Sequence, residues 1–151
     1  MKHASRHLSI IAALLAAAAV SGCTPGVPGS PQPPAGQPPL ADTSWVLESY
    51  GDPSSPSAVL PGTEITVHFD GHTEMTGMAG CNSYGGTYAS QLDGSLEIID
   101  ITQTEMFCVE PGVMDQEALY LDLLRDAERY EYVNDRLLIS SGSQMLMFRR
   151  S

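Results

Sequence analysis

The chain has 151 residues and a formal net charge of −11, because 18 Asp and Glu residues face only 7 Lys and Arg residues. Hydrophobic residues make up 42% and charged residues 17%, a globular composition that excludes a charge-rich disordered chain. The length predicts a single domain. A nucleic-acid partner needs a basic surface to neutralise its phosphates, so the acidic balance argues against one.

Residues 1–22 have the pattern of a secretion signal. Lys2 and Arg6 precede an apolar run over residues 8–20, which is shorter than the about 20 residues of a membrane-spanning helix. Small residues then precede Cys23, and this arrangement resembles the lipobox of bacterial lipoproteins. The resemblance implies cleavage before Cys23 and acylation there, with palmitate among the expected chains, as a membrane anchor. The alternative is an ordinary secretion signal followed by a chance cysteine.

Both interpretations place the mature chain outside the cytoplasm. In a cell with two membranes we expect an outer-membrane lipoprotein that faces the periplasm, and otherwise a lipoprotein of the cell membrane. Cleavage removes Lys2 and Arg6 but no acidic residue, so the mature net charge is −13.

Residues 23–40 follow as the lipidated cysteine and a proline-rich tether. Between Thr24 and Leu40 lie seven prolines, three glycines and no charged residue. Such a segment cannot bury a core, and it predicts an extended, semi-rigid spacer between the anchor and a folded domain over residues 41–151.

Alternating apolar residues in this domain predict antiparallel strands joined by short turns. Asp70-Gly71, Asp93-Gly94, Asn134-Asp135 and a turn around Ser141-Gly142 each join two such runs. The predicted strands cover residues 43–50, 64–69, 72–77, 87–92, 95–101, 130–133, 136–140 and 144–148.

One helix is predicted within residues 110–129, where apolar residues recur three or four positions apart. These are Met114, Ala118, Leu121, Leu124 and Ala127. The helix acids, Glu117, Asp122, Asp126 and Glu128, are predicted on a solvated face, with Arg125 and Arg129 as partners. The fold class is therefore α+β: a mostly antiparallel, strongly curled sheet or partial barrel of about seven to eight strands with one helix packed on it.

Two segments carry a family resemblance. Residues 77–88 read GMAGCNSYGGTY, and Thr104-Glu105-Met106-Phe107-Cys108 stands just before the helix. Together with Trp45-Val46-Leu47 and the closing Leu146-Met147-Phe148, they resemble the META domain, the HslJ-like family of heat-shock and envelope lipoproteins. Family members often carry Arg where Glu105 stands. The resemblance implies a small envelope domain associated with stress responses, without an established reaction.

Asn82, Tyr84, Tyr88 and Met106 belong to these segments and form a candidate binding loop. Their structural interpretation is that Asn82 bonds local backbone at a turn and that the two tyrosines fill core space with their hydroxyls at the rim. The functional interpretation is a ligand or partner site, since loops on rigid scaffolds often carry function.

Cys81 and Cys108 remain once Cys23 is lipidated, and an even number in an oxidising compartment favours a disulfide between them. The alternative is a redox pair or a cysteine nucleophile. A C-x-x-C pair does not occur, and a nucleophile would need His68 or His72 as its base.

The run His68-x-Asp70-x-His72-x-Glu74 raises a metal site as an alternative, but its spacing does not force a ligand geometry and we predict none. The preferred hairpin register pairs Phe69 with Thr73. It places His68 opposite Glu74 on the solvent face and leaves His72 in the loop.

We therefore predict a bacterial envelope lipoprotein with a non-enzymatic domain, no cofactor, and a binding or envelope-stress role. Its expected partners are the membrane, through Cys23, and an envelope protein. One alternative is an acidic inhibitor of a cationic hydrolase such as lysozyme. The other is a small metal- or thiol-dependent enzyme built on Cys81, His68 and His72.

Overall fold

A computed structural model describes residues 36–151 of the chain. The predicted signal peptide, the lipidation of Cys23 and most of the predicted tether lie outside the described residues. Among residues 36–151, no helix is both long and apolar enough to cross a membrane.

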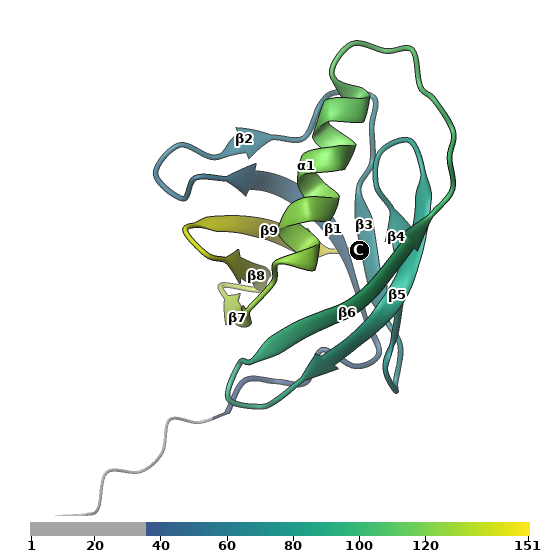
Figure 1. The fold of residues 1–151 in the computed structure, drawn as a ribbon. Helices are drawn as coiled ribbons and strands as arrows, with labels where there is room; N and C mark the ends of the chain where they lie inside the picture. The colour runs from purple at the N-terminus through teal and green to yellow at the C-terminus, as the bar shows by residue number, and fades with distance from the viewer. Residues whose placement is uncertain (1–35) are drawn as a thin grey trace, which may run out of the picture. The chain divides into compact units, whose positions relative to one another are not determined.

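Nine strands and one helix make up the domain (Figure 1). The strands are β1 (Thr43–Gly51), β2 (Ser57–Ala58), β3 (Thr66–Phe69), β4 (Glu74–Met78), β5 (Ser83–Ser90), β6 (Leu96–Gln103), β7 (Arg129–Val133), β8 (Arg136–Ser141) and β9 (Gln144–Arg150). The helix is α1 (Val113–Arg125), between β6 and β7.

All strand pairs are antiparallel and belong to one sheet of order β6-β5-β4-β3-β1-β9-β8-β7, with β2 paired to β1. The five neighbouring pairs that do not include β1 all join strands that are consecutive in sequence, which confirms the predicted meander. The sheet curls into a half-barrel with α1 in its open side (Figure 1). The predicted fold class is confirmed.

The two edge strands, β6 and β7, meet only where both begin. Ser95 forms an isolated bridge with Arg129, and the amide of Leu96 donates to the carbonyl of Glu128. Beyond this point the strands diverge, and α1 packs against β6, β8 and β9. The helix therefore covers the opening of the curled sheet and completes the core.

The buried face of α1 is displaced from the predicted one. Leu121 and Leu124 are buried as expected, but Met114 is half-buried and Ala118 is exposed. Val113, Gln116, Glu117, Tyr120 and Leu123 supply the rest of the buried face. The apolar spacing did not predict the buried face correctly, because two of its positions, Gln116 and Glu117, carry polar side chains that form hydrogen bonds with loops of the sheet.

Residues 36–40, assigned above to the tether, pack on the domain. Leu40 is fully buried, and the amide of Gln37 donates to the carbonyl of Leu92 at 2.5 Å. The hydroxyls of Tyr130 and Tyr132 donate to the carbonyls of Pro38 and Pro39. This segment links the β5–β6 turn to β7 at one end of the half-barrel.

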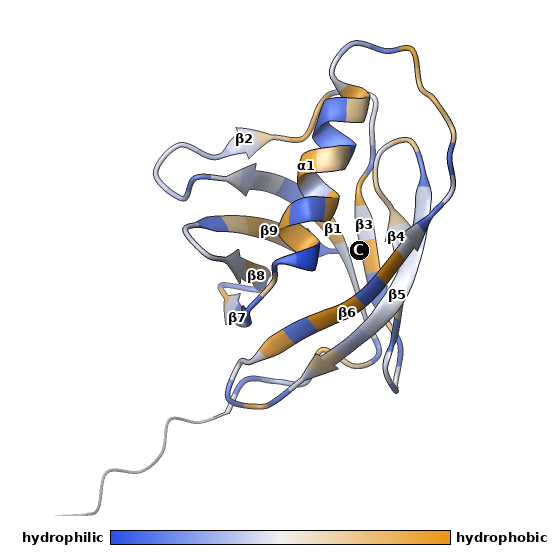
Figure 2. Ribbon diagram, viewed as in Figure 1, coloured by the Kyte–Doolittle hydropathy of each residue, from blue (hydrophilic) through white to orange (hydrophobic). Residues whose placement is uncertain are grey.

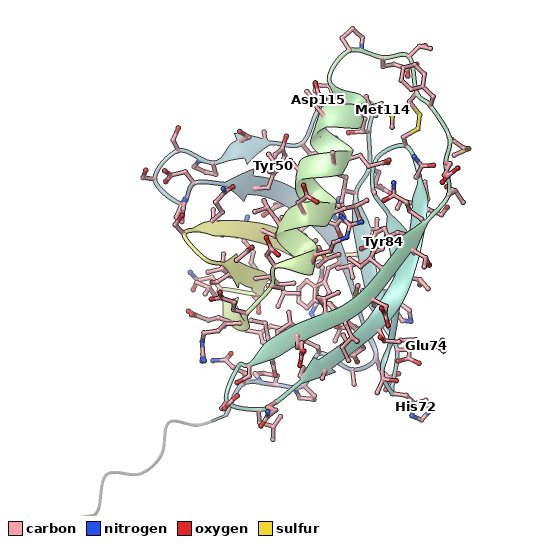
Figure 3. The ribbon with its side chains drawn as sticks, viewed as in Figure 1. Tyr50, His72, Glu74, Tyr84, Met114 and Asp115 are labelled. Atoms are coloured by element: carbon pink, nitrogen blue, oxygen red, sulfur yellow. A yellow bond between two sulfur atoms is a disulfide. The ribbon has the colours of Figure 1, made fainter. Side chains whose placement is uncertain are left out.

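The predicted register of the β3–β4 hairpin is wrong. Phe69 pairs with Met75 and His68 with Thr76, so five residues form the loop in place of three. The side chain of Asp70 explains the longer loop: its Oδ1 accepts hydrogen bonds from the amides of His72 and Glu74. His72 does lie in the loop, and Figure 3 shows His72 and Glu74 projecting from its tip.

Candidate functional site

The loop between β6 and α1 carries the largest exposed apolar side chains that lie close together in sequence. Phe107 and Val109 are 80% and 79% exposed, and Met106 is 55% exposed. We call these three residues the apolar tip. Figure 2 shows this stretch as apolar at the end of the domain that lies opposite the entry of residues 36–40. Apolar side chains at such exposure contribute little to the core, and their clustering makes this loop the candidate site.

Cys108 lies within the tip and is joined to Cys81 by a disulfide, as predicted. The bridge spans 27 residues of sequence and ties the loop to the turn between β4 and β5. Since both sulfurs are in this bond, neither cysteine is a free nucleophile in this structure.

A second attachment joins the same loop to the same turn through Asn82, which is 1% exposed. Its Oδ1 accepts hydrogen bonds from the amide of Met106 and the hydroxyl of Thr104, both at 2.7 Å. Its Nδ2 donates to the carbonyl of Met106 at 3.1 Å. Asn82 thus fixes the backbone on one side of the tip and has no exposed surface for a ligand.

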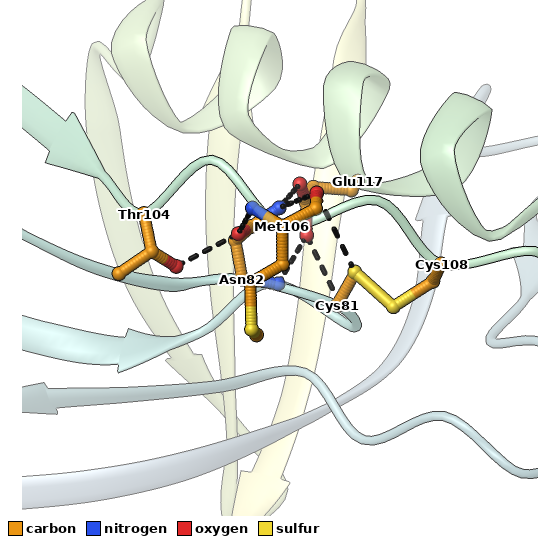
Figure 4. Close-up of a disulfide and its surroundings, with 6 residues drawn as sticks. All are labelled: Cys81, Asn82, Thr104, Met106, Cys108 and Glu117. Atoms are coloured by element: carbon orange, nitrogen blue, oxygen red, sulfur yellow. Dashed lines mark hydrogen bonds between the residues drawn. A yellow bond between two sulfur atoms is a disulfide. The ribbon is translucent and has the colours of Figure 1, made fainter.

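Glu117 holds this arrangement from α1 (Figure 4). Its Oε2 accepts from the amides of Cys81 and Asn82, at 3.0 and 2.7 Å, and its Oε1 accepts from Nδ2 of Asn82 at 2.6 Å. The prediction of Glu117 on a solvated face is therefore wrong, because it is 1% exposed. A buried carboxylate is tolerated here because three N–H groups satisfy it.

Tyr84 and Tyr88 of the predicted binding loop lie in β5, and their side chains are buried. The hydroxyl of Tyr84 donates to the carbonyl of Thr66 and lies 2.6 Å from that of Tyr120. Burial raises the pKa of both Tyr84 and Tyr120. The hydroxyl of Tyr88 donates to the carbonyl of Asp70. Both tyrosines fill core space as their structural interpretation expected, but the hydroxyl of Tyr84 is buried beside that of Tyr120 and does not lie at the rim. Of the four candidates, Met106 alone offers exposed surface.

The residues of the alternative metal site do not converge. Nδ1 of His68 forms a hydrogen bond with the hydroxyl of Ser44. The carboxylate of Asp70 accepts hydrogen bonds from the backbone amides of His72 and Glu74. Within residues 36–151, no group of three or more His, Cys, Asp or Glu side chains is placed to hold a metal ion.

Charge is divided unevenly along the chain. Residues 36–124 contain 14 Asp and Glu residues and no Lys or Arg, whereas residues 125–151 contain all five arginines of the mature chain. We call residues 36–124, which include β3–β6, the tip and most of α1, the acidic half of the domain. Next to the tip stand Glu105 and Glu110, both exposed, and Asp115 in the first turn of α1.

Sequence reasoning missed Phe107, Val109 and Glu117 as residues of the site. A signal for the first two existed: large apolar residues stand between Glu105 and Glu110 in a segment that ends in Pro111-Gly112 and has no strand alternation. The sequence carries no such signal for Glu117, because an acidic residue in a helix that contains several others cannot be distinguished from a solvent-exposed one.

Comparisons with known proteins agree with this fold. The META domain family model matches residues 38–151. The NMR structure of a protein from Burkholderia xenovorans is 29% identical, with a TM-score of 0.64, covering 83% of this chain and 99% of that one.

A DUF4847 family protein from Bacteroides vulgatus is 15% identical, with a TM-score of 0.55 over 74% of this chain and 94% of that one, and shares the fold. A search of curated proteins finds no match. Because the family model covers most of the chain, including every strand and the helix of the half-barrel, the chain belongs to the META domain family.

Proposed function

We propose that this protein is a lipid-anchored envelope module without catalytic activity, and that it binds a partner protein through its apolar tip. The single observation that carries the proposal is a loop that is held rigidly and yet exposes Met106, Phe107 and Val109. The anchor at Cys23 and the envelope location come from the sequence pattern of residues 1–23.

The rigidity of the tip supports binding. The Cys81–Cys108 disulfide and the Asn82 hydrogen bonds attach the loop on both sides of Phe107. A loop that is ordered before binding loses less conformational entropy when the partner covers it. A central aromatic side chain with apolar neighbours and a polar rim is also the usual composition of an interface hot spot.

The charge around the tip supports a cationic partner. Glu105 and Glu110 flank the tip in the sequence and are exposed, and Asp115 lies in the first turn of the helix that follows. Residues 36–124, which include the tip, contain no Lys or Arg. Complementary charge would speed association and reject acidic surfaces. A cationic hydrolase such as lysozyme is one partner of this kind, so inhibition of such an enzyme remains the second candidate function.

The test places a photo-crosslinking amino acid at position 107 in the lipidated protein in its own cells. We expect crosslinking to one protein with a basic surface, in an amount that falls when the envelope is washed with high salt before irradiation.

The matched control places the same amino acid at position 92, because Leu92 is also exposed, at 59%, but lies in the β5–β6 turn. Equal crosslinking from both positions, or none from position 107, would overturn the proposal. A crosslinked partner that is acidic would keep the tip as an interface and remove the electrostatic argument.

A further inference from the structure

The outer edge of β6 has main-chain groups without a strand partner beyond its first residues. β6 is an end of the sheet order, and the only pairing on its outer side is the bridge between Ser95 and Arg129 within residues 36–151. An exposed edge of this kind can pair with another strand.

The alternation of the β5–β6 ladder identifies which amides point outward. The amide of Thr104 donates to the carbonyl of Ser83, on the β5 side. In an antiparallel pair every second residue donates to the same neighbour, so Thr102 also points towards β5. The amides of Ile101 and Gln103, which stand opposite Gly86 and Tyr84, therefore point away from the sheet.

A cleft lies between this edge and α1, and apolar side chains line its helix wall. The cleft is open, has a volume of about 230 Å³, and is lined by Gln103 of β6 and by Met114, Ala118 and Leu121 of the helix. These are the residues that the apolar spacing placed on the buried face of the helix, yet Met114 is half-buried and Ala118 exposed. Figure 3 shows Met114 at the end of α1 where the helix receives the tip loop.

The acidic side chains on the other face of β6 favour a strand that carries basic residues. Asp100 and Glu97 are exposed on the strand, and Asp122 lies on the rim of the cleft. Arg125 is the cation of this cleft, and it is bonded to Asp122 at 3.0 Å. An added strand would place every second side chain towards the cleft and the others beside these acids.

We propose that the outer edge of β6 accepts an extended segment of the partner protein as an additional strand, with apolar residues facing α1 alternating with basic residues. This inference deepens the proposed function and rests on it for the partner, because the β6 edge adjoins the tip loop in the same acidic half. Main-chain hydrogen bonds would give affinity, and the alternation would give specificity.

The test titrates a capped Lys-Val-Lys-Val-Lys-Val-Lys peptide into residues 23–151 carrying Cys23→Ser, followed by backbone amide NMR. We expect saturable binding, with the amides of Ile101 and Gln103 shifting and gaining protection from hydrogen exchange. The same peptide with proline at its centre keeps the charge but cannot pair as a strand, and we expect it to bind at least about tenfold more weakly.

Two protein variants make the test specific. Gln103→Pro removes one outward amide without removing a β5–β6 hydrogen bond, and we expect it to weaken peptide binding about tenfold while the far-UV circular dichroism stays unchanged. Gln103→Ala keeps the amide and should bind within about twofold of the parent.

Absence of binding at about 1 mM peptide, or equal affinity of Gln103→Pro and Gln103→Ala, would overturn the inference. So would a loss of peptide binding in Phe107→Ser with none in Gln103→Pro, because the peptide would then occupy the tip. Crosslinking from position 107 does not depend on the β6 edge, so the proposed function and this inference can fail separately.

Discussion

Glu117 connects three parts of the molecule through one side chain. It belongs to α1, but its hydrogen-bond donors are Cys81 and Asn82 in the β4–β5 turn, and Asn82 in turn fixes the backbone of Met106 in the apolar tip. Removing an acceptor from such a buried cluster leaves donors without partners, which costs more than the hydrogen bond itself contributes.

We expect Glu117→Gln to lower the free energy of unfolding by about 1–3 kcal/mol. The amide offers one acceptor in place of two, so its NH₂ group would face another donor whichever way it is turned. The measurement is the urea midpoint with an unchanged m-value. Glu128→Gln is the control, because Glu128 is exposed, and a change within about 0.5 kcal/mol is expected there. Equal effects of the two variants would contradict the role assigned to Glu117.

The phenols of Tyr84 and Tyr120 make the stability depend on pH in the alkaline range. Burial raises the pKa of both groups, so the folded protein keeps their protons at pH values where the unfolded chain begins to lose them. Their contribution to stability is therefore fully present below about pH 10, the ordinary tyrosine pKa, and falls as the pH rises above it.

We expect the free energy of unfolding to fall as the pH rises above about 10, and to fall less steeply in Tyr120→Phe, which has one titrating phenol fewer. Urea unfolding at several pH values measures both slopes. Parallel slopes in the two proteins would show that the buried phenol pair does not cause the alkaline loss.

At the scale of elements, Gly77 allows β3, β4 and β5 to approach one another. A Cβ at this position would overlap the carbonyl oxygen of Thr66 and lie 2.8 Å from the hydroxyl of Tyr84. Those two atoms are joined by a hydrogen bond. Only the structure identifies the atoms for which this glycine leaves room.

We expect Gly77→Ala to destabilise the domain by about 1–3 kcal/mol, because the backbone carbonyl cannot move away without disturbing the ladder. Gly85→Ala is the matched control in the neighbouring strand, since its Cβ would lie 3.6 Å from the carbonyl oxygen of Met75, an ordinary contact. That change should be neutral or stabilising by up to about 1 kcal/mol. Thermal or urea unfolding compares the two, and the reverse order would refute the packing argument.

At the scale of the whole molecule, the ends of the half-barrel have different roles. One end carries the tip with Glu105 and Glu110, and the other receives residues 36–40 (Figure 1). Leu40 closes that second end and is fully buried, and it caps a core that already includes Trp45. The folded domain therefore depends on residues that precede position 41.

We expect Leu40→Ala to cost about 2–5 kcal/mol, as for other fully buried leucines. A chain that begins at residue 41 should lose at least as much, whereas Pro39→Ala, at an exposed position, should change stability by less than about 1 kcal/mol. Urea unfolding of the three proteins checks this order. Equal stability of the parent chain and the chain that begins at residue 41 would show that the N-terminal segment adds nothing.

The sequence by itself determined the architecture of this protein. Period-two alternation, the Asp93-Gly94 and Asn134-Asp135 turns and one helical stretch are local signals, and local signals identify elements and the order of hairpins. Asn134 and Asp135 do adopt positive φ in their turn, as such a hairpin requires. The Cys81–Cys108 disulfide followed from cysteine count and compartment.

Only the tertiary structure decided which side chains face the core and which face a partner. Glu117 is buried because a turn 35 residues away supplies its hydrogen-bond donors. The side chain of Asn82 is buried because it bonds the backbone of the loop that follows β6. The hairpin register of β3 and β4 depended on one Asp70 side chain. Phe107 is exposed on a loop that the disulfide and Asn82 attach to the β4–β5 turn. Each outcome depends on contacts between distant parts of the chain, which no local pattern in the sequence records.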